Sequence, residues 1–103
     1  MIKYSLFPNG KNLEISLHGD LDIDSTEVIE EELIPAMEKY KTVKVNFGNV
    51  PFVDSSGMGL LMDLVHTLND KGTIVTVSDV SDEVMQVFQL LQLPEILGQQ
   101  VFV

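Results

Sequence analysis

The spacing of the apolar residues changes along this chain, and these changes limit the folds that it can adopt. Over residues 2–6 and again over 13–17, apolar residues occupy every second position, which is typical of strands with one buried face. The pair Asn9-Gly10 between these segments favours a tight hairpin turn. Residues 43–47 alternate in the same way and 74–77 form a short apolar run, so we expect two further strands.

A helix is expected after the hairpin, because apolar residues then recur three or four positions apart from Ile29 to Tyr40. Asp24, with Glu27 three residues later, has the pattern of a capping box at the start of this helix. Pro35 lies within the helix and lacks a backbone donor, so we expect a kink there.

Two more helices are expected in the second half of the chain. Gly72 is typical of a C-terminal cap for a helix that carries apolar residues from position 58 onward. Ser81 is expected to cap a third helix, which ends before Pro94 because the residue before a proline disfavours helical geometry. Residues 101–103 are apolar and predict a short edge strand.

This order of elements predicts an α/β fold with a mixed, mostly parallel sheet of four to five strands that begins with an antiparallel hairpin. Polar residues such as Glu14 and Lys44 alternate with the apolar residues of the strands, whereas parallel strands covered on both faces are usually continuously apolar. We therefore expect the helices to pack mainly on one face of the sheet. There is no repeat, linker or low-complexity segment, which indicates a single domain over residues 1–103.

Composition excludes several classes of protein. The chain has no cysteine, which rules out disulfides and thiolate metal sites. Its net charge of −10 would repel nucleic acids and anionic membranes, and it would favour encounter with a basic protein partner. No apolar run approaches the roughly 20 residues of a membrane helix, and because Met1-Ile2-Lys3-Tyr4 lacks the long apolar run of a signal peptide, we expect none. We expect a soluble, cytoplasmic protein that binds neither membranes nor nucleic acids directly.

The segment Asp54-Ser55-Ser56-Gly57-Met58-Gly59 carries the strongest functional signal. It follows a predicted strand and begins a predicted helix, at the edge of an α/β sheet where binding sites are common. Two adjacent serines exceed what one helix cap needs, and the two glycines disfavour a helix, which suggests close approach by another backbone. A phosphate on a serine at this position would be favoured by free backbone amides and by the helix dipole.

This segment resembles the signature of the anti-sigma factor antagonists, which belong to the STAS domain family. Gly19-Asp20-Leu21-Asp22 resembles a second element of the family, and the expected order of strands and helices agrees with its fold over essentially the whole chain. The resemblance implies a bacterial signalling protein without catalytic activity, cofactor or metal of its own. Such a protein binds an anti-sigma factor serine kinase and so frees a sigma factor. Phosphorylation ends this binding, and a serine phosphatase restores it.

The resemblance also implies roles for individual residues. It places the phosphoacceptor at Ser55, and Ser56 is then expected to cap the helix. Asp22 and Asp54 would hydrogen-bond the acceptor serine or position it for the kinase. The expected partner-binding surface and environment of the phosphoserine comprise Asp20, Asp22, Asp24, Asp54, Ser56, Gly57, Met58 and Gly59.

Two other functions fit these residues less well. Asp20, Asp22 and Asp24 alternate like the start of a calcium loop, but Ser25 stands where such a loop requires glycine. A serine hydrolase is disfavoured because there is no Gly-x-Ser-x-Gly motif. Two alternatives stay open: a STAS scaffold or sensor subunit of a stress-signalling or lipid-transport complex, and a nucleotide-binding module that uses the same helix start.

Overall fold

The computed structural model describes all 103 residues and contains one sheet with the strand order β1-β2-β3-β4. The strands β1 (Lys3–Asn9) and β2 (Asn12–His18) form an antiparallel hairpin. The strands β3 (Thr42–Asn49) and β4 (Ile74–Ser78) extend the sheet in parallel with β2. The predicted mixed, mostly parallel sheet with an N-terminal hairpin is therefore confirmed.

The segment between β2 and β3 is helical but irregular. It starts with a 3-10 turn, η1 (Ile23–Ser25), continues as a π-helix, η2 (Val28–Leu33), and ends as a short α-helix, α1 (Ile34–Met37). Pro35 lies in the first turn of α1, directly after the π-helix. A kink was expected at this proline. The hydrogen-bonding pattern changes here from π-helical to α-helical, because Pro35 has no backbone N–H to donate.

The cap predicted at Asp24 was wrong, because the helical segment begins two residues earlier. Asp22 accepts a hydrogen bond from the backbone amide of Asp24 at 3.0 Å. The Ser25 hydroxyl in turn accepts one from the amide of Asp22 at 3.2 Å. Ser25 thus takes the reciprocal place in the capping box that Glu27 was expected to fill.

The second and third predicted helices are confirmed as α2 (Ser55–Asp70) and α3 (Asp82–Leu90). Gly72 follows α2 with a φ of 87°, the left-handed backbone that a C-terminal cap requires. The hydroxyl of Ser81 caps α3 by accepting a hydrogen bond from the amide of Val84 at 3.2 Å. None of the helices combines the length and the apolar character that a bilayer-spanning segment requires.

The C-terminal segment differs from the expected edge strand over 101–103. After α3 the chain forms a short helix, α4 (Leu93–Leu97), and a 3-10 turn, η3 (Gln99–Val101). Phe102 then makes a single parallel bridge to Val77 of β4. Because Val101 belongs to the 3-10 turn, residues 101–103 form one isolated bridge and not the predicted fifth strand.

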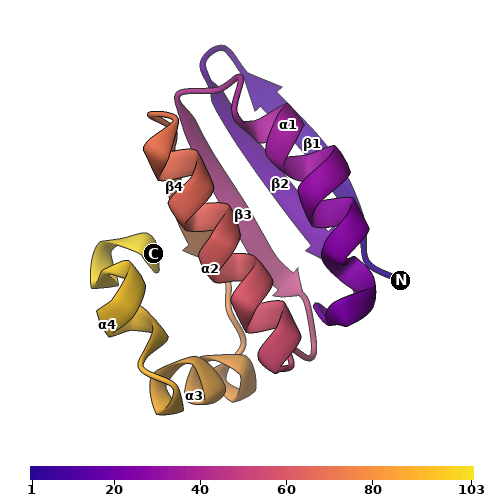
Figure 1. Cartoon of the computed structure of the whole chain (residues 1–103), viewed down its shortest axis with the longest axis vertical. Helices are drawn as coiled ribbons and strands as arrows, with labels where there is room; N and C mark the ends of the chain where they lie inside the picture. The colour runs from indigo at the N-terminus through magenta and orange to yellow at the C-terminus, as the bar shows by residue number, and fades with distance from the viewer.

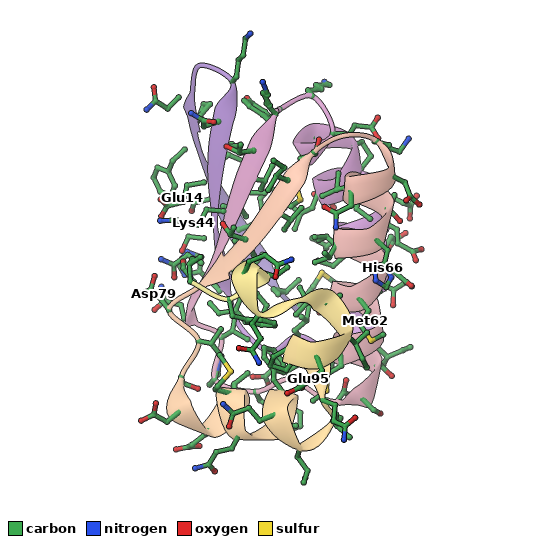
Figure 2. All side chains as sticks on the ribbon, turned by 90° about the vertical axis from the view of Figure 1, so that its left-hand side faces the viewer. Glu14, Lys44, Met62, His66, Asp79 and Glu95 are labelled. Carbon is green, nitrogen blue, oxygen red and sulfur yellow. The ribbon has the colours of Figure 1, made fainter.

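The helices cover one face of the sheet. Figure 1 shows α1 and α2 side by side in front of the strands, with α3 and α4 toward the lower left. Burial alternates along β2, where Ile15 and Leu17 are buried and Glu14 is exposed. Glu14 and Lys44 of β3 are neighbours on the uncovered face, away from the helices (Figure 2). The prediction of one-sided packing is therefore confirmed.

A surface hydrogen bond joins the first strand to the helical layer. The hydroxyl of Tyr4 in β1 donates to Oε1 of Glu32 in η2 at 2.7 Å. This bond raises the pKa of the Tyr4 hydroxyl above its ordinary value, because it favours the protonated form and places the phenol beside a carboxylate.

Phe88 of α3 holds the C-terminal segment against the sheet. Its side chain is fully buried, and its ring centroid lies 6.2 Å from that of Phe47 in β3 and 5.8 Å from that of Phe102. The Phe47 contact is edge-to-face, the geometry that aromatic rings prefer. This cluster packs α3 against β3 and the C-terminal segment.

Phe88→Ala should lower the free energy of unfolding by about 3–5 kcal/mol, because it leaves a cavity inside the aromatic cluster. Chemical denaturation followed by circular dichroism measures this value. Phe7→Ala is a matched control, since Phe7 is 56% exposed on the uncovered face of the sheet. A loss below about 1 kcal/mol for Phe88→Ala would show that the cluster does not stabilise the fold.

Candidate functional site

The loops that follow β2 and β3 lie side by side at one end of the sheet and build the candidate site. The amide of Leu21 donates to the carbonyl of Phe52 at 3.0 Å, and the amide of Asp54 donates to the carbonyl of Leu21 at 3.3 Å. Leu21 and Val53 also form an isolated parallel bridge. This pairing brings the loop after β2, which contains Asp20 and Asp22, next to the start of α2. Both segments lie past the carboxyl ends of parallel strands.

Asp54, and not Ser56, caps α2. Its Oδ1 accepts a hydrogen bond from the amide of Gly57 at 2.8 Å, and its carbonyl accepts one from the amide of Met58 at 2.9 Å. The expectation for Ser56 was wrong because Asp54 has the extended backbone of a residue that precedes a helix, whereas Ser56 lies inside the first turn.

Ser55 is the first residue of α2, and its side chain is exposed. Because Asp54 supplies the cap, the hydroxyl of Ser55 forms no hydrogen bond within the chain. The neighbouring Ser56 is half-buried. The backbone amides of both serines precede the first intrahelical hydrogen bond of α2 and have no partner in the helix. An exposed hydroxyl beside free amides can carry a phosphate, whose charge the helix dipole favours.

The aspartates of the site mainly organise its backbone. The carboxylates of Asp22 and Asp54 each accept a hydrogen bond from a backbone amide in a helical turn, and neither forms one with Ser55. Asp20 and Asp24 are exposed at the surface of the loop. Nowhere in the structure do three or more acidic or histidine side chains gather closely enough to hold a metal ion.

Ser25 is an organising residue that the motifs did not indicate as part of the site. It is fully buried, and its hydroxyl donates to the carbonyl of Asp20 at 3.3 Å while it accepts from the amide of Asp22. These two bonds close the loop between β2 and η1. The available sequence signal was the three-residue spacing of Asp22 and Ser25, which is that of a capping box.

Gly57 lies directly against the backbone of the neighbouring loop. A Cβ at this position would collide with the Leu21 carbonyl, at 2.7 Å from its carbon, and would lie 3.0 Å from Val53 Cγ1. The predicted close approach by another backbone is thus confirmed for Gly57. For Gly59 it was wrong, because Gly59 is exposed and a Cβ there would meet no other atom within 4 Å.

The exposed surface of the site differs in part from the expected set. Gly57 and Met58 are buried, and Met58 packs in the hydrophobic core with 4% exposure. Two large apolar side chains that no motif indicated are exposed instead: Ile23 is 65% exposed and Phe52 is 53% exposed. Ile23 lies in a 3-10 turn and Phe52 in a loop, where strand and helix periodicity gives no information, so their exposure could not be predicted.

Gly57→Ala should destabilise the protein by about 1–3 kcal/mol, because the added methyl group must displace the Leu21 backbone. Gly59→Ala is the matched control within the same helix. Since its Cβ meets open space, it should stabilise the fold by about 0.5–1 kcal/mol through higher helix propensity. Thermal unfolding measures both variants, and equal effects would contradict the special role of Gly57.

Comparison with known proteins agrees with this geometry. Residues 8–102 match the family model of the STAS domain. The anti-sigma-B factor antagonist of Staphylococcus epidermidis is 29% identical over 85 residues, which cover 82% of this chain and 79% of that protein. A solved structure of a sulfate transporter family protein from Wolinella succinogenes has a TM-score of 0.80 at 20% identity, over 93% of this chain and 79% of that one. The Bacillus cell fate determinant SpoIIAA in its phosphorylated form has a TM-score of 0.67 at 24% identity, over 98% of this chain and 89% of that one. Because the family model spans nearly all of the sequence, the chain belongs to the STAS domain family.

Proposed function

We propose that this protein is an anti-sigma factor antagonist that binds an anti-sigma factor kinase and is switched off by phosphorylation of Ser55. The observation that carries this function is the exposed, unbonded hydroxyl of Ser55 at the start of α2. A kinase can reach such a hydroxyl without unfolding the helix. The name of the Staphylococcus epidermidis relative and the phosphorylated form of SpoIIAA support the same function.

The local geometry favours Ser55 over Ser56 as the acceptor. Both serines lie in the first turn of α2, but Ser55 is exposed and Ser56 is half-buried. Phosphate transfer to Ser56 would therefore require more of the helix start to move. The bound phosphate on Ser55 would lie beside the free amides of the first turn, so the modified protein keeps its fold.

Electrostatic repulsion explains how the phosphate would end binding. A kinase must hold the phosphates of its nucleotide opposite the acceptor hydroxyl. Once Ser55 carries a phosphate of about −1.5 to −2 charges, the two sets of phosphate groups repel each other across the interface. The nearby Asp54 and the net charge of −10 add to the negative field around the site. The antagonist is thus released, and a serine phosphatase in the cytoplasm would return it to the binding form.

Incubation with ATP and an anti-sigma factor kinase from the same organism, followed by mass spectrometry of the product, tests this function. Phosphate should appear on Ser55, in the wild type and in the control variant Ser56→Ala. Ser55→Ala should keep kinase binding and lose phosphorylation. Ser55→Asp should weaken binding by roughly tenfold or more, because like charges opposed at an interface cost several kcal/mol.

Phosphate on Ser56, or on neither serine, would overturn the assignment of the acceptor. Equal affinities of Ser55→Ala and Ser55→Asp for the kinase, measured by calorimetry, would instead contradict the electrostatic mechanism.

A further inference from the structure

A shallow groove lies between residues 51–53, which precede α2, and the helix α3. Its volume is about 140 Å³. Six residues line it: Pro51, Phe52, Val53, Glu83, Val84 and Val87. The volume is close to the ~150 Å³ that accommodates a benzene molecule in an apolar cavity, so the groove can hold one apolar side chain.

The exposed apolar surface continues from the groove along α3. Glu83, Val87 and Leu90 recur at positions i, i+4 and i+7, which places them on one face of the helix. Val87 is 38% exposed, Leu90 is 81% exposed, and Phe52 on the opposite wall of the groove is 53% exposed. Single exposed apolar residues are ordinary, but a group of them around a groove is typical of an interaction site.

The charge around the groove has one sign. No lysine or arginine occurs between Lys44 and Lys71 or after Lys71, so both walls of the groove come from segments without a positive side chain. Glu83 lines the groove, and Asp82 precedes it at the start of α3. This surface is complementary to an apolar side chain flanked by lysine or arginine. A second copy of the acidic chain would be repelled.

The groove is also close to the acceptor serine. Val53 lines it and stands two residues before Ser55. Figure 1 shows α3 and the first turn of α2 at the same, lower end of the molecule. A side chain seated in the groove would therefore hold its own protein next to the Ser55 hydroxyl.

We propose that the anti-sigma factor kinase docks here, by inserting an apolar side chain into the groove while an adjacent lysine or arginine faces Glu83. This docking site rests on the proposed function and adds the chemistry by which the kinase recognises the antagonist. Aliphatic or aromatic burial supplies the affinity, and the charge pair at the rim speeds the encounter and makes it dependent on salt.

Calorimetry tests this site with the full chain, an anti-sigma factor kinase from the same organism and a non-hydrolysable ATP analogue. Val87→Ser should weaken binding by roughly tenfold or more, as loss of a side chain at the centre of an interface does. The matched control is Ile74→Ser, because Ile74 is also a β-branched residue and is 60% exposed on β4, outside the groove. It should change the affinity by less than about twofold. Circular dichroism verifies that each variant is folded, and Leu90→Ser, at a more exposed position, repeats the test if Val87→Ser is not.

A second pair of variants tests the charge. Glu83→Gln should slow association and reduce its dependence on salt, whereas Glu14→Gln on the uncovered face of the sheet should do neither.

The outcomes test the docking site and the proposed function separately. If the wild type binds the kinase and is phosphorylated on Ser55, but Val87→Ser and Leu90→Ser bind equally well, the groove is not the docking site and the proposed function stands. If the wild type neither binds nor is phosphorylated, both fall. Light scattering that shows a dimer of the wild type and a monomer of Val87→Ser would assign the groove to a second copy and overturn kinase docking.

Discussion

The start of α2 can lie against the loop after β2 only because Gly57 has no side chain. The carbonyl of Leu21 occupies the space that a Cβ would need, and the same carbonyl accepts a hydrogen bond from the amide of Asp54. This contact joins the two loops that follow adjacent parallel strands. The cap at Asp54 and the exposure of Ser55 both depend on it, because it determines where the helix begins.

The aspartates around Ser55 combine two physical roles. Asp22 and Asp54 use their carboxylates to satisfy free amides at the starts of η1 and α2, which stabilises the backbone of the site. Their negative charges also contribute to the negative field around Ser55, and a phosphate there would add further negative charge. The two backbone amides of the first turn that remain free would lower the electrostatic cost of a phosphate within the chain. The effect of phosphorylation would then be felt mainly by a bound partner, and a switch of this kind needs no large change of conformation.

Ser55 and the groove lie at one end of the molecule, and several of the lysines lie at the other. Lys11 in the hairpin turn and Lys41 before β3 are hydrogen-bonded neighbours through their backbones, whereas no lysine occurs between Lys44 of β3 and the end of α2. Such a separation of charge would orient a basic partner toward Ser55 before contact. Exposed Phe52 and Val87 would then provide the apolar area that long-range attraction lacks.

The sequence by itself determined the order of the elements, the one-sided packing of the sheet and the motif that contains Ser55, because apolar periodicity and turn residues act over a few neighbouring positions. Only the tertiary structure decided which residue caps each helix and which glycine is required. Asp22 and Asp54 took the places predicted for Asp24 and Ser56, since a cap is chosen by a backbone conformation that the pairing of two distant loops sets. Gly57 and Gly59 look alike in the sequence, and they differ only because Leu21, far away along the chain, packs against one of them. The predicted edge strand over 101–103 failed for a similar reason, because the packing of Phe88 against Phe102 accompanies a 3-10 turn there.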